Sequence, residues 1–244
     1  MLYILLPAYN EEEGLEKLLE RINRITRSFA IKYKLIIVND GSKDHTVSVI
    51  KSYSVGMPIE LINLKKNQGI AEVFRTGFKR ICEEAQDDDI CITMDSDNTQ
   101  NPYVMLDIIE ELKSYDVVIA SRFKEGGKMV GAPFIRKILS IGVAWILMRL
   151  TPINGVRDYS TFYRGYRIGV LKKAMSTYGD SLIEGQGFSS MAKMLIRLRN
   201  LTDKFAEVPL ILRYDLKEGG SGIRIFRTIR GYLTIFAQII NKKL

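Results

Sequence analysis

The sequence has few of the residues that mark a secreted, disulfide-bonded or membrane-spanning protein. Its 244 residues include two cysteines, Cys82 and Cys91, which stand in apolar surroundings without the spacing of a metal site. We expect both to be reduced core residues, which suits a reducing compartment. No uninterrupted apolar run reaches the ~18–20 residues that a membrane-spanning helix needs. The apolar start at Met1–Leu6 ends at Pro7, which argues against a signal peptide.

The sequence also lacks two nucleotide-binding motifs and a catalytic pairing of histidine with serine or cysteine. No G-x-G-x-x-G follows a predicted strand, which counts against a dinucleotide-binding dehydrogenase, and no G-x-x-x-x-G-K-[ST] indicates a P-loop NTPase. The one histidine, His45, lies in a predicted loop and has no serine or cysteine motif to pair with. Nucleophilic catalysis that depends on a histidine is therefore not expected.

Charge is divided unevenly along the chain. The formal net charge is +8, but residues 1–121 carry 14 Lys/Arg against 20 Asp/Glu, whereas residues 122–244 carry 22 against 8. The acidic first half does not suit a general nucleic-acid-binding protein, so we expect no nucleic-acid partner. The basic second half suits an anionic partner, either a phosphate-bearing molecule or a membrane surface. A basic face that is merely solvated stays open as the alternative.

The first half alternates short apolar runs with amphipathic segments. Between Glu12 and Ser28, for example, leucine and isoleucine recur at helical spacing. This alternation predicts a single α/β domain with a Rossmann-like, mostly parallel central sheet that helices flank on both faces. The predicted strands are 2–6, 34–38, 60–63, 90–94 and 116–120, and the predicted helices are 12–28, one from about 44, 68–84 and one after Pro102.

The second half is less regular, but no linker separates it from the first. The helix predicted at 134–150 is strongly apolar and has basic residues near its ends, which suits a helix lying on a surface, with core packing as the alternative. The last helix carries Arg224, Arg227 and Arg230 on one face and is expected to pack on the sheet. We also predict strands at 158–165 and 205–212, and helices at 168–177, 187–201 and 223–240.

Polar residues gather where four predicted strands end. In a parallel sheet such ends share one edge, where ligands bind, so the four groups predict one pocket. Asp95 and Asp97 alone would suit either a turn or a divalent-cation site, and the neighbouring groups favour the cation. The groups are Pro7-Ala8-Tyr9-Asn10-Glu11, Asn39-Asp40-Gly41-Ser42, Asp95-Ser96-Asp97 and Ser121-Arg122.

Seven segments in a fixed order give the chain a family likeness. Each is short, but together they resemble family 2 glycosyltransferases of the GT-A fold. The likeness is greatest to the branch of dolichol-phosphate mannosyltransferases and other polyprenyl-phosphate sugar transferases, and it covers nearly the whole chain. The segments are LPAYNEEEGL (6–15), IIVNDGSKDHT (36–46), NQGIAEVFRTGF (67–78), MDSDNTQNP (94–102), SRFKEGG (121–127), DYSTFYRGYR (158–167) and EVPLILRYDLKEGGSG (207–222).

The resemblance implies roles for particular residues. It makes 1–121 the nucleotide-binding half and 122–244 the half for the sugar and the lipid acceptor. Mg²⁺ or Mn²⁺ would be held by Asp95 and Asp97. The nucleotide would contact Pro7, Tyr9, Glu11, Val38, Asp40, Asp95, Ser96 and Asp97; catalysis would use Asp95, Asp97, Arg122 and Arg213; and the acceptor phosphate would meet Arg122, Arg136 and Ser140. Asn98 and Gln100 are further polar candidates.

The same resemblance implies an inverting glycosyltransferase. It would move a hexose, with mannose from GDP-mannose as the leading choice, onto dolichyl or another polyprenyl phosphate. A phosphate monoester is largely ionised at neutral pH, so it can attack without a general base, which fits the single histidine. A divalent cation and arginines would stabilise the nucleoside diphosphate as it leaves. We expect a peripheral enzyme at the cytoplasmic face of a membrane, with any anchor absent or on a partner subunit.

Other functions stay open at this point. UDP-glucose or UDP-GlcNAc could be the donor, and a glycan hydroxyl could be the acceptor. A hydroxyl acceptor would need a carboxylate base, for which Glu184 is the candidate, and Trp145 lacks the preceding Q-x-x-R motif of processive relatives. A third alternative is a nucleotide-sugar or membrane-surface binding module without activity, against which the intact Asp95 and Asp97 argue.

The sequence departs from the family pattern in three places. Asn39-Asp40 stands where many relatives have two aspartates, and Ser221-Gly222 lacks the lysine of the usual Ser-Lys. Lys217 or Arg224 could supply that missing charge. The helix near Gly187 reads GFSSMAKM, without the glutamine and glutamate of many relatives. These differences bear on which sugar is transferred and leave the predicted fold unaffected.

Overall fold

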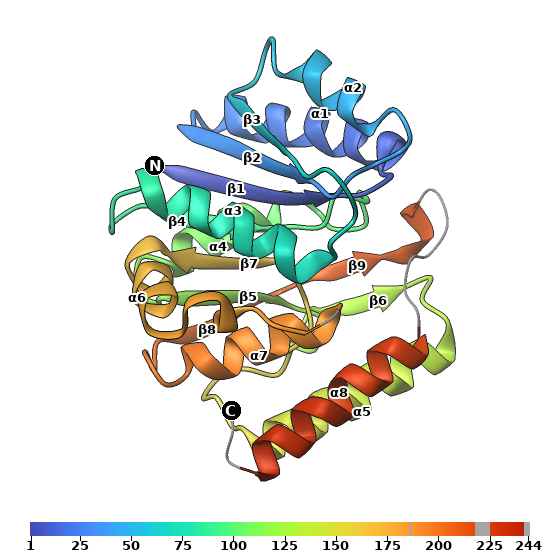
Figure 1. The fold of residues 1–244 in the computed structure, drawn as a ribbon, viewed down its shortest axis with the longest axis vertical. Coiled ribbons are helices and arrows are strands. Elements are labelled where there is room, and N and C mark those ends of the chain that lie inside the picture. The colour runs from blue at the N-terminus through green and yellow to red at the C-terminus, as the bar shows by residue number, and fades with distance from the viewer. Residues whose placement is uncertain (186, 218–224, 242–244) are drawn as a thin grey trace.

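A seven-stranded sheet forms the centre of the protein. The computed structural model describes residues 1–185, 187–217 and 225–241. The strands are β1 (Leu2–Ala8), β2 (Tyr33–Asn39), β3 (Ile59–Asn63), β4 (Ile90–Thr93), β5 (Val117–Ser121), β7 (Arg164–Arg167) and β8 (Phe205–Pro209). They are ordered β3-β2-β1-β4-β7-β5-β8 (Figure 1). Of these described strands, β7 alone runs antiparallel, to β4 and β5, so the mostly parallel sheet is confirmed.

Helices cover both faces of this sheet because its strands are apolar on both sides. In β1, Leu2 and Ile4 belong to one buried cluster, and Tyr3 and Leu5 belong to the other. This alternation follows from the two-residue period of a strand. The first cluster contains residues of α1 (Glu12–Ser28), α2 (Thr46–Tyr53) and α4 (Val104–Glu111), and the second contains residues of α3 (Ile70–Glu84), α6 (Ile168–Tyr178) and α7 (Phe188–Leu198).

Two further helices and a small ribbon complete the structure. Helix α5 (Phe134–Leu150) and helix α8 (Ile225–Ile240) lie beyond α7 (Figure 1) and contribute Leu147, Tyr232 and Ile235 to the cluster around α3. The ribbon pairs β6 (Lys128–Val130) with β9 (Ile211–Arg213). Single 3₁₀ turns form η1 (Gly179–Leu182) and η2 (Tyr214–Leu216). Within the described ranges, no helix combines the length and the apolar character needed to cross a bilayer.

Two sequence predictions in the second half were wrong in detail. The strand expected at 158–165 is a loop followed by β7, because the Asp158 carboxylate accepts the backbone N–H groups of Ser160 and Thr161 at 3.2 and 3.3 Å. The strand expected at 205–212 ends as β8 at Pro209, which has no N–H to donate, and the chain continues as β9. The three residues of β6 were not predicted.

The remaining predicted elements are present, with ends shifted by a few residues. Two sequence predictions fall on residues outside the described ranges. Arg224, part of the predicted arginine face of the last helix, and Ser221-Gly222, where the family's lysine is missing, lie outside the described residues.

Candidate active site

The four polar groups predicted at strand ends do meet at one edge of the sheet. The parallel register places Ala8 at the end of β1 beside Asn39 at the end of β2, and β4 and β5 end on the same side (Figure 1). Hydrogen bonds join the first three of these groups directly. The Ser96 hydroxyl donates to the Pro7 carbonyl at 2.7 Å, and the Asp40 N–H donates to the Ala8 carbonyl at 2.8 Å.

Three carboxylates stand together at this edge: Glu11, Asp95 and Asp97, which we call the carboxylate cluster. Burial, followed by the charges of Asp97 and Glu11, raises the pKa of Asp95 to about 8. Burial also raises the pKa of Glu11 to about 7, with Asp97 adding to the effect. The positive charge that opposes both shifts is Lys217, whose Nζ lies 2.7 Å from Asp97 Oδ2. The cluster is therefore short of positive charge.

The loop after β4 holds the two aspartates through local hydrogen bonds. Gln100 Nε2 donates to Asp95 Oδ2 at 2.7 Å, while Gln100 Oε1 accepts the Asp95 N–H at 3.0 Å. Asp97 Oδ1 accepts the Thr99 N–H and hydroxyl at 3.2 and 2.6 Å, as in an Asx turn. The turn is thus real, and it does not compete with the cation site, because it uses only one of the two Asp97 oxygens.

Helix α1 supports the same loop from outside. Arg21 donates to the side-chain oxygens of Asn98 at 2.7 Å and Asn101 at 2.9 Å. Asn98 has a φ of 58°, a left-handed conformation that asparagine tolerates better than most residues. The structure therefore gives Asn98 a role in holding the loop, and its side chain carbonyl is occupied by Arg21.

The residues present fit a divalent cation that a substrate phosphate would share. In the part of the chain that the structure describes, no group of three or more His, Cys, Asp or Glu side chains is arranged to hold a metal. Mg²⁺ is commonly bound by one or two carboxylates together with substrate phosphates and water. Asp95 and Asp97 lie beside a third carboxylate, Glu11, and match that pattern. They would therefore be the protein's ligands to the cation.

Asp40, in the polar group after β2, also holds a neighbouring loop in place. Asp40 Oδ1 accepts the Gln68 N–H at 2.7 Å and Oδ2 accepts the Gly69 N–H at 2.9 Å, and burial raises its pKa. The Asp40 carboxylate thus fixes the loop that leads into α3. Val38 is fully buried, so its side chain packs in the core, whereas Tyr9 is exposed at the edge. The nucleotide contacts of these residues stay predictions.

Arg122, at the end of β5, is committed to a buried ion pair. Its Nε and Nη2 donate to the two Asp158 oxygens at 2.7 Å each, and Nη2 also donates to the Ser160 hydroxyl at 2.6 Å. Burial alone would raise the pKa of Asp158, but Arg122 holds it below its usual value. This pair ties β5 to the loop before β7. A phosphate contact by Arg122 stays a prediction.

The predicted arginines from α5 and β9 are placed differently from each other. Arg213 donates to Asp215 at 2.6–3.0 Å on the surface, while its backbone N–H bonds to the Thr99 carbonyl at 2.9 Å. Arg136 stacks over the Tyr214 ring, with Cζ 5.0 Å from the ring centroid. Ser140, one turn further along α5, is half-buried. The structure therefore places Arg136 against Tyr214 of the segment that carries Lys217, and it pairs the Arg213 guanidinium with Asp215 of the same segment.

Glu184, the candidate base for a hydroxyl acceptor, forms ion pairs. Its Oε1 lies 2.7 Å from Arg197 Nη2 and 3.5 Å from Lys193 Nζ. Burial opposes ionisation, but Arg197 and then Lys193 lower the pKa of Glu184. A carboxylate with a lowered pKa is a weaker proton acceptor at neutral pH.

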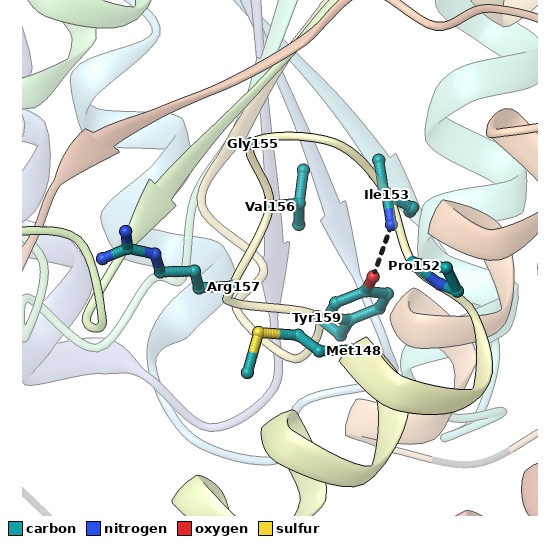
Figure 2. Close-up of a pocket in the computed structure, with 7 residues that line it drawn as sticks. All are labelled: Met148, Pro152, Ile153, Gly155, Val156, Arg157 and Tyr159. Atoms are coloured by element: carbon teal, nitrogen blue, oxygen red, sulfur yellow. Dashed lines mark hydrogen bonds between the residues drawn. The ribbon is translucent and has the colours of Figure 1, made fainter.

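The structure also contains a pocket that the sequence did not suggest. It has a volume of about 330 Å³ and lies at the C-terminal end of α5 (Figure 2). The Tyr159 hydroxyl accepts the Ile153 N–H at 3.2 Å and donates to the Thr151 carbonyl at 2.7 Å, which fixes this part of the wall. Its lining is Met148, Pro152, Ile153, Gly155, Val156, Arg157 and Tyr159, and includes none of the predicted site residues.

Lys217 is the site residue whose position the sequence did not predict. It was offered only as one substitute for the lysine missing after Ser221, on the acceptor side. Its contact with Asp97 joins residues 120 positions apart. No local pattern reports such a contact, although an unassigned lysine within a family motif was a signal that it could face phosphate or carboxylate.

Comparison with known proteins places these features in context. The model of the family "Glycosyl transferase family 2" matches residues 3–175. A dolichol-phosphate mannosyltransferase of Pyrococcus furiosus is 31% identical over 94% of this chain and 61% of its own. An undecaprenyl-phosphate mannosyltransferase of Micrococcus luteus is 27% identical over 84% and 81%. A dodecaprenyl-phosphate galacturonate synthase of Rhizobium johnstonii is 25% identical over 70% and 49%. This chain thus spans less than two thirds of the Pyrococcus relative.

Among solved structures, glucosyl-3-phosphoglycerate synthase from Mycobacterium tuberculosis is similar in fold. Its complex with Mn²⁺ and UDP-glucose has a TM-score of 0.68 and 16% identity, covering 99% of this chain and 78% of that one. Its complex with Mg²⁺ and UDP gives the same values. At this identity the likeness establishes the fold alone.

The raised pKa of Asp95 predicts that this carboxylate destabilises the metal-free protein at alkaline pH. Its pKa rises from 3.8 to about 8 on folding. The contribution of the Asp95 carboxyl group to the free energy of unfolding is therefore fully present below pH 3.8 and is lost as the pH rises towards 8. We expect Asp95→Asn to raise the melting temperature at pH 8 by about 2–4 °C, for a gain of about 1 kcal/mol. Differential scanning fluorimetry in EDTA between pH 5 and 8 measures this, and the gain should shrink as the pH falls.

Asp88→Asn is the matched control, because Asp88 is exposed in a turn and its neutralisation should change the melting temperature little at any pH. A lower melting temperature for Asp95→Asn at pH 8 would contradict the account, since it would mean that the ionised carboxylate stabilises the fold.

Proposed function

We propose a function from the premise that the chain belongs to glycosyl transferase family 2 and has the GT-A fold. The proposed reaction is the transfer of a hexose from a nucleotide sugar to a polyprenyl phosphate. Mannose from GDP-mannose is the leading donor, with UDP-glucose and UDP-GlcNAc as alternatives. The observation that carries the proposal is the carboxylate cluster at the sheet edge, short of positive charge. The names of the relatives that act on dolichol, undecaprenyl and dodecaprenyl phosphate support the acceptor class.

We assign the donor to the half formed by residues 1–121. Glu11 and Asp40 stand at the ends of β1 and β2, where a nucleoside would lie beside the aspartates. Asp95 and Asp97 would hold Mg²⁺ or Mn²⁺ together with the donor diphosphate. Such a cation, when bound, would neutralise charge on the leaving diphosphate. Gln100 and Thr99 keep the two carboxylates oriented, so these carboxylates need little reorientation when the donor arrives.

The acceptor belongs to the half formed by residues 122–244. Arg136 lies over Tyr214, three residues before Lys217, which reaches Asp97. An anionic acceptor held by Arg136 and Ser140 would therefore approach the donor from the side of α5. A phosphate oxygen of the acceptor would form the new bond to the anomeric carbon while the bond from that carbon to the diphosphate oxygen breaks. Attack opposite the leaving group inverts the anomeric configuration.

The acceptor needs no proton acceptor from the protein if it is a phosphate. Phosphate monoesters have a second pKa of about 6, so the attacking oxygen is already ionised at neutral pH. A hydroxyl acceptor would need a base, and Glu184 is engaged by Arg197 and Lys193 with its pKa lowered. This pairing favours the phosphate over the hydroxyl acceptor.

An assay with undecaprenyl phosphate in detergent tests the function. Radiolabelled GDP-mannose, UDP-glucose and UDP-GlcNAc are supplied separately with Mg²⁺ or Mn²⁺, and organic extraction measures lipid-linked sugar. We expect one donor to give product, and Asp97→Ala to lower kcat about 10²–10³-fold because charge stabilisation of the leaving group is lost. Glu184→Gln should keep most activity, since no base is required.

The exposed Asp88→Ala serves as the control for removal of an aspartate. Absence of extractable product with every donor would overturn the polyprenyl-phosphate function. Full activity of Asp97→Ala would overturn the assignment of the site, and loss of turnover in a well-folded Glu184→Gln would favour a hydroxyl acceptor.

We further propose that α5 contacts the cytoplasmic face of a membrane. Helix α5 buries only Ala144 and Leu147 among its residues, while Phe134 is 75% exposed and Trp145 is 59% exposed. The apolar face of α5 consists of Phe134, Ile135, Ile138, Leu139, Ile141 and Trp145. Basic residues at both ends of α5 suit anionic headgroups. Arg136 lies on this helix, so membrane contact would bring the lipid phosphate to the site; an anchoring partner subunit could add to it.

Replacing apolar residues of this face by glutamate should release the protein from vesicles. We expect Ile138→Glu/Trp145→Glu to weaken sedimentation with phosphatidylcholine vesicles containing 30% phosphatidylglycerol by about tenfold or more, because two large apolar side chains lose their burial. Val55→Glu, at a residue 92% exposed outside α5, is the matched control.

Unchanged sedimentation of the double variant would contradict the membrane contact. Concentration-dependent dimerisation of the wild type that the double variant abolishes, without vesicle binding by either, would show that a second copy covers the face instead.

A further inference from the structure

The ammonium group of Lys217 covers the outer oxygen of the Asp97 carboxylate. Nζ lies 2.7 Å from Asp97 Oδ2, and both side chains are largely shielded from solvent. The other oxygen, Oδ1, accepts the two hydrogen bonds from Thr99. A cation that binds Asp97 through Oδ2 must therefore take the place that Lys217 occupies.

Lys217 also acts as the counter-charge of the whole carboxylate cluster. Its charge opposes the negative charges felt by both Glu11 and Asp95. Arg122 also acts on Asp95, but the Nε–Nη2 edge of its guanidinium is engaged in a bidentate pair with Asp158. Among the described residues, Lys217 is thus the cation whose departure would leave the cluster most unbalanced.

The chain around Lys217 is built so that the side chain can leave while the segment before it stays in place. The Arg213 N–H is bonded to the Thr99 carbonyl at 2.9 Å, which anchors the start of the segment to the aspartate loop. The Lys217 N–H bonds to the Tyr214 carbonyl at 3.2 Å, closing η2. Lys217 follows this turn, so rotation of its long side chain needs no break in β9.

We propose that Lys217 is an exchangeable counter-cation, which occupies the divalent-cation position at Asp97 in the metal-free protein and moves to the donor diphosphate when the nucleotide binds. This inference rests on the proposed function, because it takes the nucleoside diphosphate and the divalent cation as the ligands. With the cation alone, Lys217 is displaced by a like charge and gains no new partner. With the diphosphate present, phosphate oxygens receive the ammonium in charge-assisted hydrogen bonds.

The consequence is that the cation and the nucleotide bind cooperatively. Each ligand lowers the free-energy cost of binding the other. The diphosphate accepts the lysine that the cation displaces, and the cation frees that lysine to reach the diphosphate. Coupling of this kind is reciprocal, so the nucleotide raises the affinity for the cation by the same factor as the cation raises the affinity for the nucleotide. The lysine would keep the site from holding a cation without a donor.

Electron paramagnetic resonance of free Mn²⁺ measures the affinity of the protein for Mn²⁺, with and without nucleotide and without any turnover. In the wild type we expect GDP or UDP to tighten Mn²⁺ binding at least about fivefold, the lower end of ordinary coupling. We expect Lys217→Met to tighten Mn²⁺ binding without nucleotide about 3–10-fold, because the competing ion pair is gone. In that variant the added effect of the nucleotide should be smaller than in the wild type.

Two variants control this result. Lys217→Arg keeps the positive charge and should retain weak Mn²⁺ binding in the absence of nucleotide. Lys113→Met removes a lysine from an exposed ion pair with Glu110 on another part of the surface and should leave Mn²⁺ binding unchanged. Circular dichroism and the melting temperature establish that Lys217→Met is folded.

Unchanged or weaker Mn²⁺ binding by folded Lys217→Met without nucleotide would overturn the exchange. A wild type that binds no Mn²⁺ with any nucleotide would instead overturn the metal-dependent function on which the inference rests. The two failures are therefore distinguishable within one titration series.

Discussion

Mutual repulsion within the carboxylate cluster is the constraint around which the site is organised. Glu11 follows β1, Asp95 and Asp97 follow β4, and burial makes their shared negative charge costly. Other residues hold the carboxylates in place: Gln100 donates a hydrogen bond to Asp95, and Lys217, 120 positions further along the chain, donates one to Asp97. A protein of this size can carry such a local cost because its doubly covered sheet supplies a large core. A divalent cation would offset this repulsion, and the donor diphosphate would share that cation.

The buried ion pair of Arg122 and Asp158 fixes the part of the site that follows β5. It ties the end of β5 to the loop that precedes β7, and Glu207 on β8 accepts the Asp158 N–H at 2.7 Å. Removing one partner of such a pair commonly costs about 3–5 kcal/mol, because the other is left buried and unpaired. The wall of the site on the side of β5 is therefore rigid.

Local patterns in the sequence predicted the architecture well. Apolar strands alternating with amphipathic helices placed four strand ends at one edge, and the structure confirms that edge. The errors came where one side chain overrides a local pattern. Asp158 captures backbone N–H groups and converts a predicted strand into a loop. The pairing of Lys217 with Asp97 could not be predicted, since it depends on how β9 crosses the aspartate loop. The role of Arg213 stays a prediction, and its guanidinium pairs with Asp215 on the surface.

The central claim is that the carboxylate cluster binds a nucleoside diphosphate only together with a divalent cation. Thermal unfolding of the intact chain with GDP, UDP and their sugars, each with Mn²⁺ and with EDTA, tests it most directly. The account predicts that one nucleotide raises the melting temperature when Mn²⁺ is present and leaves it unchanged in EDTA. Equal stabilisation by a nucleotide in Mn²⁺ and in EDTA, or no stabilisation by any of them, would contradict it.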